Sequence, residues 1–221
     1  MNTLSYSVRT FFEEIVRLNK DYEIEFSAYR KRPYSGNPAL YRARAKFIEL
    51  CVLLGVAAEH LLKAVLLKHG FVINSELHSQ IQRFTPQFLN TIQKADASNN
   101  PMLQAEFHKK AEKQFPPQSG KTIKFETCID IFNKPVANQS PYFSGIPRAS
   151  YPISNPETAR FYGKFIDTSN ALNKIRDLRN NYAHLPEPMY EDRGLIPYFY
   201  NLLLFIASKE FPEVMAGLNY I

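Results

Sequence analysis

Apolar residues recur every three or four positions along most of the chain, which is the spacing of one face of an α-helix. This spacing predicts helices over residues 4–29, 41–69 and 196–210, and a shorter one over 125–132; where the pattern weakens, it predicts short helices over 75–94 and 102–115. No alternating stretch is long enough to predict a strand. The pattern therefore predicts an all-α protein.

The segment 41–69 carries the widest apolar face of the chain, in two adjacent seams. One seam consists of Phe47, Cys51, Leu54, Ala58, Leu61 and Val65, and the other of Ile48, Val52, Gly55, Leu62 and Leu66, with Glu59 in line. Charged residues interrupt the segment, so we expect a buried central helix and not a membrane span. Gly70 is a plausible helix cap after it.

A further helix is predicted from Asn155, as N-cap, and Pro156, at the first helical position. Its apolar stripe is Phe161, Phe165, Thr168, Leu172 and Ile175, and the next steps fall on Arg179 and Tyr182. A buried guanidinium needs a partner, so Arg179 either faces a polar groove or meets a carboxylate. Alternatively, Leu178 takes the core position and the stem of Arg179 lies at the edge.

Asn180 and His184 lie four residues apart and share a helix face, whereas Arg179 diverges from His184 around the helix. Pro186 disfavours helical geometry at Leu185, which places His184 at the helix end. An imidazole there could transfer protons near neutral pH, or it could simply cap the helix as a cation.

Arg179, Asn180 and His184 together resemble the signature of the HEPN superfamily. The phrase Glu59-x-x-Leu62-Lys63-Ala64-x-Leu66-Leu67 is similar to the first core helix of many HEPN proteins. The resemblance covers residues 41–210. It implies a four-helix bundle, here with an extra N-terminal helix over 1–32 and irregular insertions, including the Pro-rich loop 133–155. We therefore expect one HEPN-like domain over 1–221.

This resemblance implies a metal-independent endoribonuclease with a toxin or defence role, active as a homodimer. Arg179 would bind the scissile phosphate, His184 would transfer protons, and Asn180 would position the phosphate or His184. In one toxin subgroup a tyrosine stands two residues after the histidine. Pro186 stands there in this chain, which argues against that subgroup. The alternatives are a non-catalytic module that binds nucleotide or RNA, and a protein-interaction module.

Two further residues are candidates for a supporting role at this site. Glu59 is either a buried partner for Arg179 or a surface partner for Lys63, four residues on. Tyr182 lies on the same helix as the motif. If Arg179 and Glu59 only paired with each other, the site would be structural.

The charge of the chain indicates which kinds of binding partner it favours. The net charge of +6 favours an anionic partner such as RNA, and a regulatory or antitoxin partner is also expected. Arg30-Lys31-Arg32 and the group Arg42, Arg44 and Lys46 could follow a phosphate backbone or form solvated helix faces.

Other motifs are missing from the sequence. The two cysteines have no zinc or disulfide spacing, and Cys51 is expected in the core. Gly120-Lys121-Thr122 lacks the earlier glycine of a phosphate-binding loop, since Phe115 stands there. We expect no cofactor, no metal and no membrane association, and a cytoplasmic protein without a signal peptide.

Overall fold

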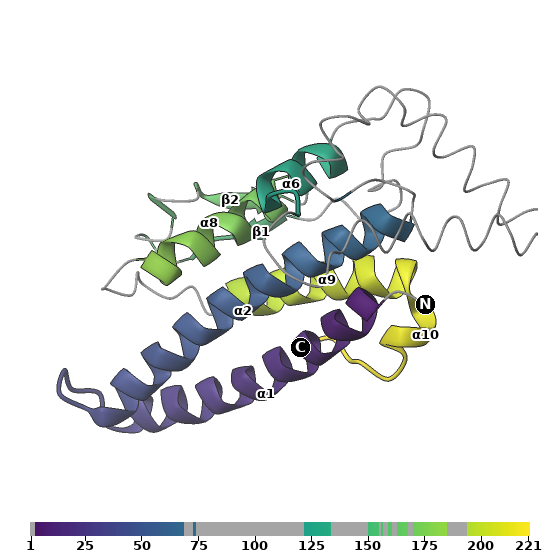
Figure 1. Cartoon of the computed structure of the whole chain (residues 1–221). Coiled ribbons are helices and arrows are strands. Elements are labelled where there is room, and N and C mark those ends of the chain that lie inside the picture. Colours follow the sequence, from purple (N-terminus) through teal and green to yellow (C-terminus); the bar gives the residue numbers. More distant parts are fainter. Residues whose placement is uncertain are drawn as a thin grey trace, which may run out of the picture.

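The computed structural model describes residues 3–68, 73, 122–133, 150–154, 156, 159–160, 163–167, 170–184 and 194–221, and these are predominantly α-helical (Figure 1). This confirms the all-α class. The helices expected over 75–94 and 102–115, the cap at Gly70 and most of the Pro-rich loop lie outside the described residues. Within that loop, Ser150–Pro152 form a short strand.

Two long helices, α1 (Thr3–Lys31) and α2 (Pro38–Lys68), form an antiparallel hairpin. The apolar face of α1 packs along α2 through Val8, Phe12, Ile15, Leu18 and Tyr22, all of which are buried. Although α1 precedes the region 41–210, it therefore supplies part of the same core as α2.

The connection between the two helices is fixed by Asn37. Its side-chain Oδ1 accepts a hydrogen bond from the backbone N–H of Ala39 at 2.9 Å, and its Nδ2 donates to the carbonyl of Arg32 at 2.7 Å. With Asn37 as N-cap and Pro38 at the first helical position, α2 begins three residues earlier than its apolar pattern predicts.

The central position predicted for α2 is confirmed. All six residues of its first apolar seam are buried, and α1, α6 (Phe125–Asn133), α8 (Ala171–His184) and α9 (Leu195–Glu210) all pack against it. By length and composition α2 could also cross a membrane, but 67% of its most apolar window is buried inside the protein. That makes it weak evidence for a membrane span.

The single helix expected from Pro156 through Ile175 is wrong. Phe165–Asp167 instead form strand β2, which pairs antiparallel with β1 (Ser150–Pro152), and α8 begins only at Ala171. Phe165 is 60% exposed and Ile166 is buried, so the alternation of a strand replaces the helical stripe. Gly163, with φ of 83°, takes a left-handed conformation just before β2 and ends the helical geometry seen at Ala159 and Arg160.

The C-terminal segment is tied to the bundle after the short helix α10 (Pro212–Met215). Asn201 on α9 exchanges two hydrogen bonds with the backbone of Ile221, at 2.7 and 2.9 Å. Arg9 on α1 donates to the carbonyls of Val214 and Ala216 at 2.5 and 2.9 Å. These contacts join the two ends of the chain to one core.

Candidate functional site

The site is centred on Arg179, which lies on α8 where this helix packs on α2. Leu178 is 1% exposed and takes the core position, whereas the Arg179 side chain is 32% exposed at the edge. The packing therefore follows the alternative in which leucine enters the core and the arginine stem lies beside it. The guanidinium nevertheless has a carboxylate partner, as the other reading required.

Gly55 on α2 makes room for the stem of Arg179. A Cβ atom added at Gly55 would lie 2.8 Å from Cδ and 2.9 Å from Cγ of Arg179, and closer still to its Cβ. The two helices can therefore approach this closely only because position 55 has no side chain. This close approach fixes where the arginine leaves the helix interface.

Glu59 lies one turn after Gly55 and binds two cations. Its Oε2 accepts a hydrogen bond from Nη1 of Arg179, and its Oε1 accepts one from Nζ of Lys63 at 2.6 Å. Glu59 thus has both of the partners that the sequence suggested, but its pair with Lys63 is largely buried and does not lie on the surface. The side chains of Glu59 and Lys63 are only 18% and 10% exposed. Thr122, just before α6, accepts a second hydrogen bond from Lys63 at 2.9 Å.

The charges of this cluster do not cancel. Burial opposes ionisation of Glu59, but the hydrogen bond and charge of Lys63, together with Arg179, outweigh it and hold the pKa of Glu59 below its usual value. One carboxylate thus faces two cations, which leaves one excess positive charge. The centroid of the Phe125 ring lies 5.9 Å from the guanidinium carbon of Arg179, within the range of a cation–π contact.

Asn180 and Tyr182 differ from Arg179 in their surroundings. Asn180 is exposed, while Tyr182 is buried and packs edge-to-face on Phe47 with 5.5 Å between ring centroids. His184 is the last residue of α8, and its side chain lies outside the described part of the chain. The structure therefore brings Arg179 together with Glu59 and places Tyr182 in the core.

Sequence reasoning missed His60. Its Nδ1 is buried and has no hydrogen-bond partner among the described residues, and its ring meets Phe11 edge-to-face with 5.1 Å between ring centroids. Burial lowers the pKa of His60, and the charges of Lys63 and Arg179 act in the same direction against Glu59. The sequence feature that could have identified it is a histidine next to Glu59 in a largely apolar stretch of helix.

Residues of α6 and the segment just before it complete the surroundings of the site, and the sequence did not identify them as site residues. Thr122 and Phe125 contact Lys63 and Arg179 as described above, and Cys128 is fully buried nearby. Burial raises the pKa of the Cys128 thiol to about 12, so it stays protonated and is not a nucleophile at neutral pH. Short helices such as α6 carry no pattern that shows which helix they cover.

Within the described ranges, no group of three or more His, Cys, Asp or Glu side chains could hold a metal ion. The groups that are present can instead bind an anion, through Arg179 and Lys63. No protein-family model matches the chain, and comparisons with curated proteins and with solved structures give no match either.

Proposed function

We propose that this chain is a metal-independent endoribonuclease of the HEPN type, built on a four-helix HEPN-like bundle and active as a homodimer. The observation that supports it best is the cationic cluster that Arg179 forms with Glu59 and Lys63 of α2, because Arg179 lies on the same helix as Asn180 and His184. Its excess positive charge suits a phosphate, and RNA is the substrate that the motif suggests.

Arg179 is suited to hold the scissile phosphate. A guanidinium has five N–H donors in a planar fork, and the contact with Glu59 engages one nitrogen, Nη1. The remaining donors on this 32% exposed side chain can hold the non-bridging oxygens. They would stabilise the extra negative charge of the phosphorane as it forms. Glu59 and Phe125 would orient the fork.

The reaction requires two proton transfers. The 2′-hydroxyl oxygen attacks the adjacent phosphorus, loses its proton to a base, and the bond from phosphorus to the 5′-oxygen breaks as that oxygen gains a proton. The products are a 2′,3′-cyclic phosphate and a 5′-hydroxyl. His184 is proposed to transfer protons, and Asn180, one turn before it, to position the phosphate or the imidazole.

The pairing of Arg179 with Glu59 also favours a second candidate, a non-catalytic module in which this pair is structural or binds an RNA end. In that case substituting His184 would leave no chemical step to lose. The two candidates therefore differ in whether the RNA backbone is broken.

The decisive experiment incubates the purified chain with RNA in EDTA, beside His184→Ala and the matched neighbouring variant Asn181→Ala. We expect cleavage without added metal, cyclic phosphate ends, and no cleavage of 2′-deoxy or 2′-O-methyl RNA. His184→Ala should lose about 10²–10⁴-fold of the rate, since this is what positioned proton transfer contributes. Asn181→Ala should keep it.

The variant Arg179→Lys tests whether the planar guanidinium group is required for cleavage. The ammonium keeps the charge but loses the planar donors, so we expect poor cleavage in a folded protein. A requirement for Mg²⁺, or equal activity in the His184→Ala protein, would favour the binding module.

A further inference from the structure

The positive charge of the chain is concentrated in one short segment. Between Glu25 and Glu49 stand Arg30, Lys31, Arg32, Arg42, Arg44 and Lys46, and no acidic residue. The segment 26–48 therefore carries a charge of +6, equal to the net charge of the whole protein. Elsewhere the basic and acidic residues balance.

In the structure this segment is the turn end of the α1–α2 hairpin, with the last residues of α1 and the first turns of α2 (Figure 1). Two of the six cations pair with the glutamates that flank the segment, Arg42 with Glu25 and Lys46 with Glu49. Within the described ranges, no ion pair involves Arg30, Lys31, Arg32 or Arg44. The first three are exposed, and Arg44 is half-buried.

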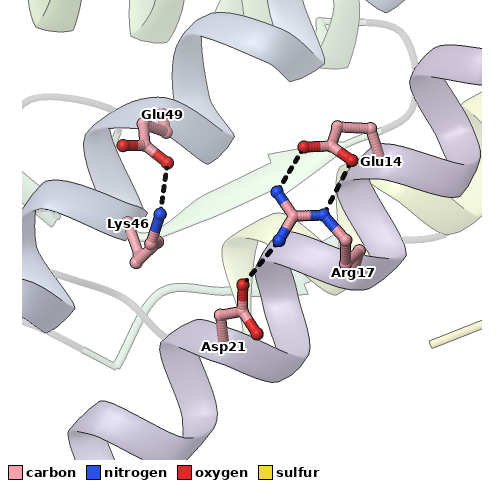
Figure 2. Close-up of polar contacts among 5 residues, drawn as sticks. All are labelled: Glu14, Arg17, Asp21, Lys46 and Glu49. Atoms are coloured by element: carbon pink, nitrogen blue, oxygen red, sulfur yellow. Dashed lines mark hydrogen bonds and ion pairs between the residues drawn. The ribbon is translucent and has the colours of Figure 1, made fainter.

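Further along α1, Arg9 and Arg17 pair with acidic side chains, and Figure 2 shows the pairs of Arg17. Arg17 lies between Glu14 and Asp21, at 2.5 and 2.8 Å. This contrast separates the turn end from an ordinary solvated helix face. Like charges that are left unmatched at one end favour an anionic partner.

Two aromatic rings accompany the unmatched cations. Tyr34 in the turn is 57% exposed and Tyr41 in the first turn of α2 is 58% exposed. Asn37, itself 8% exposed, holds the backbone between them through its bonds to Ala39 and Arg32. The rings and cations are thus presented on an ordered turn.

We infer that this turn end is a binding surface for single-stranded RNA. Cations that follow the backbone, together with exposed rings on which bases stack, are the two elements of sequence-tolerant single-strand binding. A membrane surface would favour aliphatic side chains or tryptophan beside the cations. Only Ile24, 67% exposed, is of that kind among the exposed large apolar residues described near the turn.

The position of α8 connects this surface to the proposed cleavage site, and to that extent the inference rests on the proposed function. Tyr182 packs on Phe47, which places the C-terminal end of α8 beside the N-terminal half of α2. Arg179 packs on Gly55, and Tyr41 lies 14 residues before Gly55, about 21 Å along the helix axis. A strand held by Arg179 could therefore continue over the turn end within a few nucleotides.

Binding is measured separately from cleavage, by fluorescence anisotropy of a labelled 2′-O-methyl oligouridylate, which lacks the nucleophile. Lys31→Gln/Arg32→Gln should weaken binding and reduce the slope of log affinity against log salt by about 1.4, roughly 0.7 for each phosphate contact. Tyr34→Ala/Tyr41→Ala should weaken binding roughly ten-fold or more, and Tyr34→Phe/Tyr41→Phe should not.

The matched control is Lys20→Gln/Lys164→Gln, which removes the same charge from exposed positions outside the segment. It should bind nearly as the parent does. Equal weakening in the control would overturn a localised surface. So would turn variants that bind RNA normally but lose binding to phosphatidylserine vesicles, because the surface would then face a membrane. Normal cleavage with unchanged binding in the turn variants would also overturn it, while leaving the proposed function intact.

Discussion

Arg179 donates a hydrogen bond to Glu59 across the interface between α8 and α2. The arginine lies 120 residues after the glutamate in the sequence, so the contact exists only when the two helices have packed. Lys63 shares the same carboxylate from within α2. Glu59 therefore holds together a site in which two cations would otherwise repel each other.

Removing this carboxylate should destabilise the protein. Glu59→Gln leaves Lys63, which is 10% exposed, and Arg179 without their counter-charge. Breaking a buried pair from one side costs about 3–5 kcal/mol, and partial exposure of Arg179 should reduce this to about 2–3 kcal/mol. Urea denaturation gives the free energy of unfolding.

Glu49→Gln is the matched control for Glu59→Gln, because Glu49 pairs with Lys46 at 2.9 Å on the same helix but is 50% exposed. Its loss should stay below about 1 kcal/mol. Equal losses for the two variants would show that the Glu59 cluster is no more than a surface ion pair.

The environment of His60 predicts a dependence of stability on pH. Its pKa is lowered in the folded protein from 6.5, so the unfolded chain takes up the proton more readily. Stability should therefore fall as pH drops below about 6.5, and this fall should be shallower in His60→Gln. Denaturation at pH values between 7.5 and 5.5 measures it.

Above pH 5.5, the ionisation of Glu59 does not contribute to this dependence of stability on pH. Its pKa is lowered from 4.5, so its stabilising effect is complete above that value and is lost only as pH falls further. Parallel curves for the parent and His60→Gln would mean that His60 titrates alike in the folded and unfolded chains.

The close packing of Gly55 against Arg179 predicts that a single added methyl group is harmful. Gly55→Ala should gain about 1 kcal/mol in helix propensity but lose about 1–3 kcal/mol to overpacking against the near end of the arginine side chain. We expect a net loss of about 1 kcal/mol, read from thermal or urea unfolding.

Ala45→Gly provides the calibration, because Ala45 is exposed on the same helix. It should cost about 1 kcal/mol from propensity alone. If Gly55→Ala instead raised stability by the same amount, α8 would not press on α2 at this position.

The long helices could be predicted because their apolar faces are wide and repeat over many turns. The predicted helix 4–29 is observed as Thr3–Lys31, and 196–210 as Leu195–Glu210. The strand around Phe165 could not be predicted, because a strand of three residues fits the apolar spacing of a helix as easily as the alternating pattern of a strand. Pairing with Ser150–Pro152 decides between them, and this contact is not encoded locally.

At the site, too, the local pattern predicts individual residues but not the contacts between segments that are distant in the sequence. Glu59 and Arg179 were selected because each interrupts an apolar stripe, and their pairing confirms that each needed a partner. Lys63 bridging to Thr122 could not be predicted, since nothing in the sequence places the start of α6 beside α2. His60 could not be predicted, because a single histidine within an apolar helix is usually a core or surface residue.

The divergence of Arg179 from the exposed face of Asn180 predicts that a complete site needs two chains. Arg179 faces α2, whereas Asn180 is exposed. We expect a two-fold dimer with the α8 ends near the axis, so that Arg179 of one chain acts with His184 of the other. Sedimentation at micromolar concentration would detect the dimer.

Mixing two inactive variants tests this sharing directly. Arg179→Ala and His184→Ala chains should each be inactive alone, but a mixed dimer has one site with both groups intact. Random pairing makes half of the dimers mixed, and each has one working site of two, so roughly a quarter of the parent cleavage rate should return. A monomeric protein, or a mixture that stays inactive after exchange of subunits, would mean that no site is shared between chains.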